Sequence, residues 1–541
     1  MHRRDRLLRL ATTSFDLCVI GGGITGAGIA RDAAMRGLSV ALLERDDFAS
    51  GTSSRSSRLI HGGVRYLEHG HVGLVFEASR ERRTLLRIAP HLVRPLAFTW
   101  PVYEGARIQR WTLEAGLTLY DALALFRNVG SHKRLAVDGV LAAEPAVAPD
   151  GLVGGARYWD AATSDARLTL ATMAGAEEHG AICLNHCRVV GRVATASPAQ
   201  TVHAVDVLSG EALAIAATVV VNATGPWSDA VNQALGAPGG QAVLGSKGVH
   251  IAVPAAHVGN RGALTLLAPN DGRVFFVLPA GPCSIIGTTE TVATSSPDAV
   301  RATEDDVRYL LDATRHFFPA ATLSRASVIS AWAGIRPLAA SRAHGDSASA
   351  SREHTIATVA PGVLAVTGGK LTTYRAMAAD VVNAVCRVTG RPADSAATAT
   401  TLLPGGDIGP LPVEIARATH AGHAPAVAEH LIHNYGSAWV RIDALVRDDP
   451  TLGDEIESGL PYRLAEVVYA AQHEQAMTLA DVLMRRTFIA FETRDNGRGA
   501  AQRIAPLVGR VLGWHPAAVA QAVTNYDAEA ARIFGIDPSS P

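Results

Sequence analysis

The sequence predicts an α/β fold in which two sheet-containing domains are interleaved, followed by an all-helical C-terminal domain. A short apolar run near the start breaks into glycines and resumes as a helical pattern, which is typical of a strand, a tight turn and a helix. Strand patterns return in separated stretches up to about residue 366, whereas only helical patterns follow Leu403. Since 541 residues exceed what one hydrophobic core usually serves, we expect two or three domains.

The first strand leads into Gly21, Gly23 and Gly26, which have the G-x-G-x-x-G spacing of a dinucleotide-binding turn. The first glycine permits the turn, the second lets backbone N–H groups approach a pyrophosphate, and the third lets the helix pack on the strand. The helix is expected at 25–36, and a second strand at 38–43 leads to Glu44, whose carboxylate would hold a ribose hydroxyl. This succession predicts a Rossmann-like nucleotide-binding domain.

The elements that follow are expected to lead into a second domain. An amphipathic helix is expected at 72–89, ended by Pro90, and a proline-bounded strand at 94–103 begins a second sheet. A helical stretch at 108–127 carries Trp111 and Phe126 among basic residues. This stretch has two interpretations, a helix on an anionic membrane surface or a helix that caps the second domain.

The middle of the chain supplies the remaining strands. We expect strands at 189–193, 212–222, 249–253, 274–278, 284–288 and 363–366. A helix at 304–317 begins after Thr303 as N-cap. A second pair of glycines precedes a helix at 371–386, whose N-terminus would direct its positive dipole end toward a bound ring or substrate.

The last part of the chain shows helical patterns at 413–420, 425–435, 463–476, 479–488 and 500–512. Asp481, Arg485 and Arg486 are expected to form ion pairs within their helix and between domains. The order of elements predicts a nucleotide-binding domain in three pieces, a mixed-sheet substrate domain in two pieces, and a helical domain. Their bounds are 14–95, 161–244 and 346–400 for the first, 96–160 and 245–345 for the second, and 401–541 for the third.

Composition narrows the class of protein. The 49 basic and 50 acidic residues give a net charge of −1, which argues against nucleic-acid binding. Five cysteines without a C-x-x-C pair indicate neither a disulfide framework nor zinc and favour the cytosol. His61, His69 and His71 lack a carboxylate or cysteine partner, so no metal is expected. No run reaches the roughly 18 apolar residues of a spanning helix. We expect a cytoplasmic protein, either free or peripheral on the inner membrane face.

A family resemblance rests on six separated motifs. Residues 52–68 read T-S-S-R-S-S-R-L-I-H-G-G-V-R-Y-L-E, where a nicotinamide-binding domain would normally continue with another helix and strand. Further motifs occur in order at 222–227, 247–250, 286–289, 334–338 and 368–375. The sequence resembles the FAD-dependent, quinone-linked (aerobic) glycerol-3-phosphate dehydrogenases. The resemblance implies oxidation of sn-glycerol 3-phosphate to dihydroxyacetone phosphate, with hydride transferred to FAD and electrons passed to a membrane quinone.

The resemblance also implies the residues that contact FAD. They are Gly21, Gly22, Gly23, Ile24, Thr25, Gly26, Glu44, Arg45, Thr52, Ser53, Ser54, Ser57, Arg58, Leu59, His61, Gly62, Val189, Ala223, Gly225, Gly369, Lys370, Leu371 and Thr372. We expect FAD to be bound without a covalent link. A homodimer is left open.

The substrate residues follow from charge and from the motifs. A phosphate monoester is close to a dianion near pH 7 and calls for guanidinium and ammonium groups. Arg65, Arg336 and Lys370 match positive positions of the family's substrate pocket, and Thr372 is added as a substrate contact. Arg336 is also counted with the catalytic residues.

Two residues compete as acceptor of the hydroxyl proton. His250 is favoured by the ordinary pKa of imidazole, and Tyr66, next to Arg65, is the alternative. Other functions also stay open: an oxidase that reduces oxygen, a glycine or amine oxidase with the same two-domain plan, and a flavin-containing binding or tRNA-modifying factor.

Overall fold

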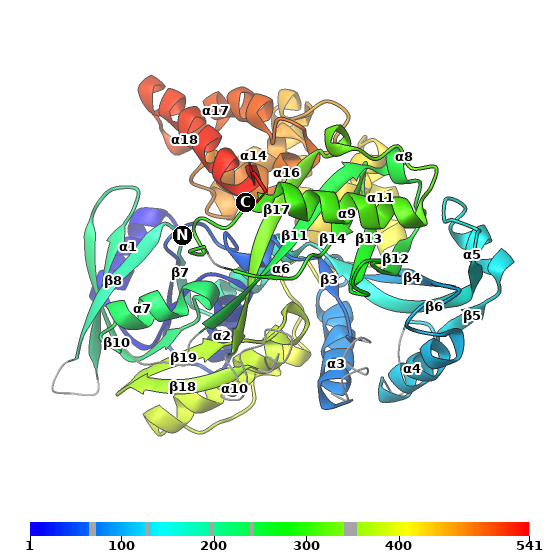
Figure 1. The fold of residues 1–541 in the computed structure, drawn as a ribbon. Helices are drawn as coiled ribbons and strands as arrows, with labels where there is room; N and C mark the ends of the chain where they lie inside the picture. Colours follow the sequence, from blue (N-terminus) through cyan, green and yellow to red (C-terminus); the bar gives the residue numbers. More distant parts are fainter. Residues whose placement is uncertain are drawn as a thin grey trace.

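The computed structural model describes residues 1–63, 72–124, 129–194, 199–237, 243–293, 295–339 and 354–539. Two sheets lie side by side, and the helices of the C-terminal domain pack across one side of both (Figure 1). This arrangement confirms the predicted fold class. The domain bounds given above stay a prediction.

The first sheet is built around β1 (Ser14–Ile20), whose parallel neighbours are β2 (Val40–Leu43) and β10 (Ala212–Asn222). Alternate residues of β1 face opposite layers. Leu17 and Val19 pack against the helices α2 (Ile24–Met35), α6 (Asp165–Glu178) and α10 (Tyr374–Thr389). Cys18 and Ile20 join a core with α1 (Arg3–Thr12) and the paired strands β8 (Cys187–Ala194) and β9 (Gln200–Asp206). Because both faces of the sheet are covered there, the strand is buried and apolar from Leu17 to Ile20.

The remaining elements of this domain extend or cover the sheet. The strands are β7 (Ile182–Leu184), β8 (Cys187–Ala194), β9 (Gln200–Asp206), β18 (Thr355–Ala360) and β19 (Val363–Thr367). The helices are α1 (Arg3–Thr12), α2 (Ile24–Met35), α6 (Asp165–Glu178), α7 (Ser228–Ala234) and α10 (Tyr374–Thr389).

The second sheet is mixed and forms the core of the predicted substrate domain. Its strands are β3 (Leu59–Ile60), β4 (Val93–Tyr103), β5 (Lys133–Leu135), β6 (Leu152–Thr163), β11 (Val243–Pro254), β12 (Ala263–Leu267), β13 (Val274–Ala280), β14 (Cys283–Gly287), β15 (Thr291–Val292) and β17 (Ser330–Ala339). Val249, Ile251 and Val253 of β11 share a buried core with α9 (Glu304–Phe317). His250 belongs to the opposite face of that strand. The other helices of this domain are α3 (Val72–Ile88), α4 (Arg110–Leu123), α5 (Val137–Ala143) and α8 (Ala255–Val258).

The C-terminal domain shares one continuous core with the second sheet, since Trp332 of β17 and Phe491 fall in the same buried cluster. Its helices are α11 (Leu411–His420), α12 (Pro425–Tyr435), α13 (Trp439–Asp448), α14 (Leu464–His473), α15 (Leu479–Asp481), α16 (Ile489–Glu492), α17 (Arg498–Leu512) and α18 (Pro516–Phe534). The last strand in the described part of the chain is β20 (Ile536–Asp537), which pairs with β16 (Ala302–Thr303) beside the start of α9.

Several predicted elements are confirmed and others are wrong in detail. The helix at 304–317 is confirmed, with Thr303 in a capping box. A single helix at 479–488 is wrong: α15 ends at Asp481 and a π-helical turn, Val482–Arg486, follows. The helix after the second glycine pair begins at Tyr374, because residues 371–373 form a single 3₁₀ turn. Part of the helix expected at 108–127, including Phe126, lies outside the described residues.

Candidate active site

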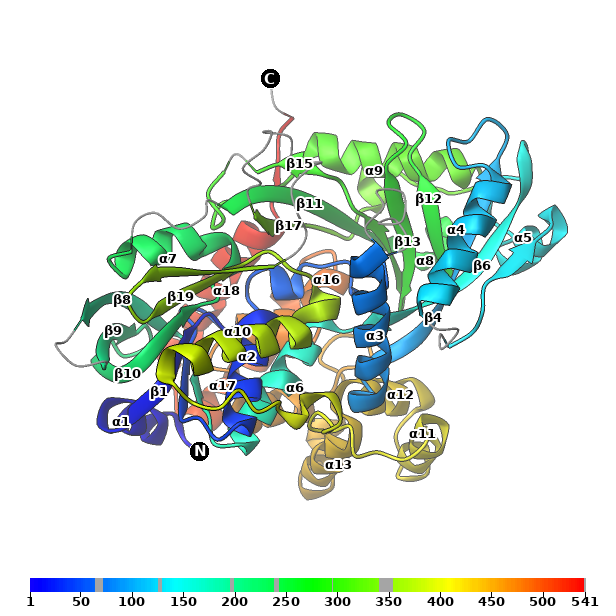
Figure 2. The ribbon, with the colours of Figure 1, turned by 90° about the horizontal axis from the view of Figure 1, so that it is seen from below.

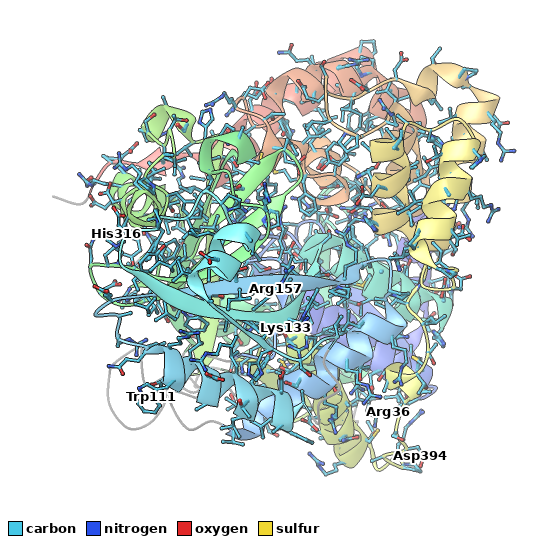
Figure 3. The ribbon with its side chains drawn as sticks, turned by 90° about the vertical axis from the view of Figure 1, so that its right-hand side faces the viewer. Arg36, Trp111, Lys133, Arg157, His316 and Asp394 are labelled. Atoms are coloured by element: carbon cyan, nitrogen blue, oxygen red, sulfur yellow. The ribbon has the colours of Figure 1, made fainter. Side chains whose placement is uncertain are left out.

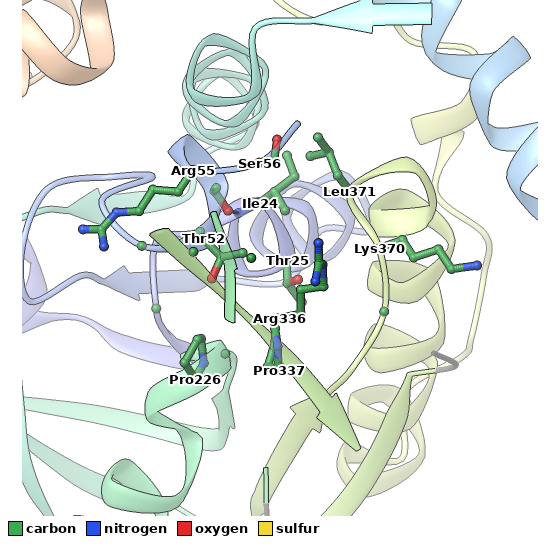
Figure 4. A pocket seen from close by; sticks show the side chains of 18 of the residues that line it. Ile24, Thr25, Thr52, Arg55, Ser56, Pro226, Arg336, Pro337, Lys370 and Leu371 are labelled. Carbon is green, nitrogen blue, oxygen red and sulfur yellow. Dashed lines mark hydrogen bonds between the residues drawn. The ribbon is translucent and has the colours of Figure 1, made fainter. Parts of the chain in front are cut away.

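A cavity of about 500 Å³ lies where the carboxyl ends of β1, β10 and β19 meet the faces of β11 and β17. Figure 4 shows side chains from both sheet domains around it, with Ile24 and Thr25 at the start of α2 and Arg336 on β17. The carboxyl ends of parallel strands are the usual binding edge of such sheets.

The glycine turn forms one wall of the cavity. Gly21 has φ +110°, a conformation open to glycine, and a Cβ at Gly26 would overlap the Gly21 carbonyl oxygen. The turn is thus closed against the first turn of α2. The Ile24 N–H at the start of α2 donates to Ser53 Oγ at 3.0 Å. A helix N-terminus held in this way presents its positive dipole end to the cavity.

Glu44 stands at the end of β2 as predicted and lines the cavity. Its carboxylate accepts the Gly22 N–H at 2.6 Å and the Asp46 N–H at 2.9 Å. Burial, with the neighbouring charge of Asp46, raises the pKa of Glu44 to about 7. The group is therefore fixed by the backbone and suited to hydrogen bonding with a ribose hydroxyl.

The serine-rich loop after β2 is tied to three other elements. Thr52 Oγ1 donates to the Ile335 carbonyl of β17 at 2.7 Å. Ser56 donates from both its N–H and its hydroxyl to buried Asp165, at the start of α6. Ser57 Oγ lies 2.9 Å from His250 Nε2. These bonds explain why the loop is dense in hydroxyls.

His250 lies in a row of four residues that crosses the second sheet. The strand register places Phe276, Gly287, His250 and Trp332 opposite one another on β13, β14, β11 and β17. The imidazole lies over Gly287, where a Cβ would overlap it, and stacks on Trp332 with ring centroids 5.6 Å apart. Burial, and then the charges of Arg336 and Arg58, lower the pKa of His250 to about 3. The ring is therefore neutral near pH 7.

Arg336 reaches the same cavity from β17. One guanidinium nitrogen lies 3.2 Å from Thr288 Oγ1 and another 3.4 Å from Ser246 Oγ. Lys370 also lines the cavity, but its side chain extends away from the other labelled groups (Figure 4). The structure thus places one of the three predicted cations, Arg336, beside His250, while Arg65 lies outside the described residues together with Tyr66.

The loop before residue 64 is held by a buried network. The Gly62 N–H donates to Tyr120 Oη and to Asp160 Oδ1, both at 3.0 Å. Tyr120 donates to Asp160 at 2.6 Å, and Arg82 contacts both side chains. This network connects α3, α4 and β6 to the cavity, which Asp160 lines.

Most of the predicted cofactor residues line the cavity. They are Gly21, Gly23, Ile24, Thr25, Glu44, Arg45, Thr52, Ser53, Ser57, Leu59, His61, Val189, Ala223, Gly225, Gly369, Lys370 and Leu371. The predicted residues outside this lining are Gly22, Gly26, Ser54, Arg58, Gly62 and Thr372.

Two of those outside the lining have clear positions. Thr372 Oγ1 is bonded to both the N–H and the carbonyl of His61 at 3.2 Å, so it braces the loop. The Arg58 guanidinium lies 3.8 Å from the centroid of the Phe488 ring in the C-terminal domain. We therefore do not assign the Arg58 side chain to the cofactor.

Sequence reasoning missed Trp332, Thr288 and Phe276. A signal for Trp332 was present in the sequence. Trp332 lies four positions before Arg336, and residues an even number of positions apart on a strand point to the same face. Thr288 lies within a motif that was recognised without a role being assigned. Phe276 is brought to the site by pairing between β13 and β14, which no local pattern encodes.

The cavity fits FAD on the structural observations. The turn has no side chain at Gly21 or Gly23, the start of α2 faces the cavity, and the buried carboxylate of Glu44 stands at the end of β2. The cavity then continues to His250 and Arg336. The part of the cavity that would hold the phosphates of FAD and the part that holds His250 and Arg336 thus form one connected space.

Comparisons with known proteins agree with this geometry. A family model described as FAD dependent oxidoreductase matches residues 16–375, and one described as the C-terminal domain of alpha-glycerophosphate oxidase matches 396–519. The glycerol-3-phosphate dehydrogenase of Synechocystis sp. is 39% identical over 522 residues, which are 93% of this chain and 94% of that protein. The mitochondrial glycerol-3-phosphate dehydrogenase of Homo sapiens is 37% identical, over 95% of this chain and 72% of that protein.

Two solved structures are similar to this chain, one over nearly its whole length and one over part of it. The glycerol-3-phosphate dehydrogenase from Bacillus halodurans complexed with FAD has a TM-score of 0.81 and 28% identity, over 98% of this chain and 97% of that chain. The L-alpha-glycerophosphate oxidase from Mycoplasma pneumoniae has a TM-score of 0.56 and 18% identity over 69% of this chain, which shows a shared fold alone.

These matches span the nucleotide-binding domain, the substrate domain and most of the helical domain. They confirm the predicted resemblance and the FAD cofactor. The chain belongs to the family of FAD-dependent glycerol-3-phosphate dehydrogenases.

Proposed function

We propose that this enzyme oxidises sn-glycerol 3-phosphate to dihydroxyacetone phosphate, with Arg336 binding the phosphate and His250 accepting the hydroxyl proton, and that the electrons pass to a membrane quinone. The observation that carries the proposal is the joint placement of a guanidinium and a neutral buried imidazole on adjacent strands facing one cavity. The names of the relatives support the substrate.

Different residues along the cavity would hold different parts of FAD. Gly21, Gly23 and the start of α2 would hold the pyrophosphate, and Glu44 would hold a ribose hydroxyl. Gly369 and Leu371 would hold the far end of the cofactor near the second glycine pair. When bound, FAD supplies the acceptor for the hydride that leaves the carbinol carbon.

His250 serves as the proton acceptor because it is neutral and has a fixed orientation. Its Nε2 is aligned by Ser57 Oγ at 2.9 Å, and its ring plane is set by Gly287 and Trp332. A substrate phosphate beside Arg336 would offset the guanidinium charge that lowers the pKa of His250. Substrate binding therefore makes the imidazole a stronger base at the step that needs one.

A membrane acceptor is supported by exposed apolar side chains on two neighbouring helices, α3 and α4. We call this set the α3/α4 face and define it as Val72, Phe76, Trp111 and Leu119. The exposed fractions of these side chains are 42%, 43%, 69% and 44%. α4 packs on the protein through Leu113, Leu117 and Tyr120, so Trp111 and Leu119 are not needed for its own packing. Among the described residues, no helix has the length and apolar character required to cross a bilayer.

Exposed cations lie on α3 and on β5, whose Arg134 is 3.5 Å from the Glu114 carboxylate of α4. Arg80 and Arg83 are exposed on α3, and Lys133 and Arg134 are exposed on β5. In Figure 2 the molecule is seen from below, with α3 in front. Figure 3 shows Trp111 near the lower edge, with Lys133 above it and to its right. Apolar side chains flanked by cations suit the surface of an anionic bilayer.

The favoured acceptor is tested by separating the two half-reactions. Anaerobic mixing with sn-glycerol 3-phosphate should bleach the flavin absorbance, and a soluble quinone analogue should restore it faster than oxygen at equal concentration. Faster recovery with oxygen would favour the oxidase alternative, which the family model of the C-terminal domain also fits. Bleaching by glycine but not by sn-glycerol 3-phosphate would overturn the proposed substrate.

A further inference from the structure

The C-terminal domain reaches the candidate active site through one aromatic residue. Phe491 of α16 contacts Trp332 edge to face, with ring centroids 5.1 Å apart and planes at 90°. Trp332 in turn stacks on His250 at an interplanar angle of 15°. All three side chains are buried. Phe491 is therefore one ring removed from the proposed base, although it lies 241 positions away in sequence from His250.

This contact is anchored at the backbone. Ser330 Oγ on β17 donates to the Phe491 carbonyl at 2.6 Å, two residues before Trp332. The Trp332 indole nitrogen is buried and has no hydrogen-bond acceptor among the described residues. The indole is thus positioned by ring contacts, with His250 on one side and Phe491 on another.

The loop on the other side of His250 meets the same domain. Ser57 holds His250 Nε2, and the next residue, Arg58, has φ +55° and directs its guanidinium to the C-terminal domain. That guanidinium lies 3.8 Å from the Phe488 ring centroid and 5.1 Å from that of Phe491. A cation over aromatic faces in a buried site is held strongly. The C-terminal domain therefore contacts both residues that orient the imidazole, Trp332 directly and Ser57 through Arg58.

We propose that Phe491 of the C-terminal domain is a positioning residue for the active-site histidine, holding Trp332 against the His250 ring and excluding water from it. The proposal deepens the proposed function, since it rests on His250 as the proton acceptor. The charged groups that face His250 are Arg336 on β17 and Arg58 in the loop, and Arg58 in turn faces Asp165 and Glu492. Replacing Phe491 changes none of these charges, and the nearer ring beside Arg58, that of Phe488 at 3.8 Å, is kept when the Phe491 ring is lost. The variant therefore tests mainly the packing and hydration of the imidazole.

The test uses Phe491→Leu in the full-length FAD-loaded enzyme. Leucine keeps an apolar side chain but removes the ring edge against Trp332, which lets the His250 ring move and admits water. The limiting rate of flavin reduction by sn-glycerol 3-phosphate should fall about tenfold, since small displacements of catalytic groups cost rate steeply. KM should stay close to that of the wild type, because Arg336 is untouched.

The pH profile distinguishes positioning from a general loss of stability. Hydration of the imidazole relieves the burial that lowers its pKa, so the acidic fall-off of the reduction rate should move to higher pH in Phe491→Leu. The matched control is Phe534→Leu, which makes the same change at a residue that contacts Phe491 at 4.9 Å. This control should lower the melting temperature without moving the profile.

A second pair of variants keeps the proposal testable if Phe491→Leu folds poorly. Trp332→Phe retains a ring opposite His250 and should keep more of the reduction rate than Trp332→Leu. An unchanged rate and profile in Phe491→Leu at normal FAD content would overturn the positioning role, as would equal profile shifts in Phe491→Leu and Phe534→Leu. Failure of the wild-type flavin to bleach with sn-glycerol 3-phosphate would instead overturn the proposed function.

Discussion

Arg336 and His250 owe their shared cavity to strand alternation. β11 and β17 are antiparallel neighbours, and the register pairs Ser246 with Arg336 and His250 with Trp332. Residues two apart on such a pair point to the same face, so all four belong to one face of the sheet. Gly248, paired with Gly334, provides the space between them that a side chain would fill.

Replacing Arg336 by Ala should separate substrate binding from cofactor binding. A charge-assisted contact to phosphate commonly contributes about 1.5 to 3 kcal/mol, so kcat/KM for sn-glycerol 3-phosphate should fall about ten- to a hundredfold. FAD content, measured by absorbance after heat release, should be unchanged. Oxidation of uncharged glycerol should fall much less. An equal loss with both substrates would show that Arg336 does not bind the phosphate.

The glycine turn gives a second prediction at this scale. In Gly26→Ala the new Cβ would meet the Gly21 carbonyl oxygen, which is backbone and cannot move aside without opening the turn. We expect purified protein with little or no bound FAD and a lower melting temperature. Gly116→Ala in α4 is the control, because nothing lies within 4 Å of its Cβ position. Alanine there should leave FAD content unchanged and stabilise the helix by about 0.5 to 1 kcal/mol.

At the scale of elements, a buried ionic cluster fixes the C-terminal domain to the first sheet. Arg485 Nε lies 2.5 Å from Asp47 Oδ2, and Arg486 contacts the same carboxylate. Asp481 accepts from Arg485 at 2.7 Å and lies 2.9 Å from His186 Nε2. The expected pairing of Asp481 and Arg485 within and between domains is confirmed, and the π-helical turn brings both arginines to the same side.

The cluster predicts how stability depends on pH. Asp481, and hydrogen bonding to it, raise the pKa of His186 against the opposing effect of burial, so its contribution is full below the ordinary value of 6.5 and is lost as pH rises through the raised pKa. His186 and the arginines hold the pKa of Asp481 well below 3.8, so its contribution is present above 3.8 and lost only in strong acid.

Thermal unfolding of wild type and His186→Gln across pH tests this dependence. The wild type should be more stable at pH 6, by about 1.5 to 3 kcal/mol if the charged hydrogen bond is lost, and the difference should shrink as pH rises above the raised pKa. A difference that is constant from pH 6 to pH 9 would mean that His186 does not titrate in this range.

The sequence specified the elements whose signals are local. The glycine turn, the capped helix α9 and the proline-started helix α12 need only neighbouring residues, and each was predicted within a residue or two of its observed bounds. Local patterns did not reveal α1, α13 or α18. The π-helical turn could not be predicted, because Val482–Arg486 is held by contacts to Asp47, more than 430 positions earlier.

The site was predictable to the same extent and for the same reason. Motifs named His250 and Arg336, since their neighbouring residues belong to recognisable runs. The partners that set the orientation of His250 come from separate segments: Ser57 from the first domain, Gly287 from β14 and Trp332 from β17. Strand pairing brings Gly287 and Trp332 to His250, and the loop after β2 brings Ser57 to it. Residue patterns within one segment carry no record of these contacts.

At the scale of the whole molecule, helix α4 connects the α3/α4 face to the cavity. α4 exposes Trp111 on its outer side and uses Tyr120 on its inner side to bind the Gly62 N–H and Asp160. A bilayer beneath α3 and α4 would therefore lie next to the helix whose Tyr120 holds Gly62. This geometry suits an enzyme whose electron acceptor is dissolved in lipid.

The last prediction tests that placement with charge substitutions. The double variant Trp111→Glu with Leu119→Glu puts two carboxylates on the α3/α4 face, where burial in an interface costs free energy and anionic lipid repels them. Sedimentation with anionic phospholipid vesicles at low salt should carry down the wild type but much less of the variant. Val413→Glu is the control, because Val413 is 60% exposed on α11, which lies well above α3 and α4 in Figure 1.

FAD reduction by sn-glycerol 3-phosphate should be normal in both variants, since neither change reaches the cavity, whereas reduction of a lipid-embedded quinone should fall in the double variant alone. Equal sedimentation of the wild type and the double variant would show that another surface meets the membrane, and absence of sedimentation in the wild type would favour a soluble acceptor.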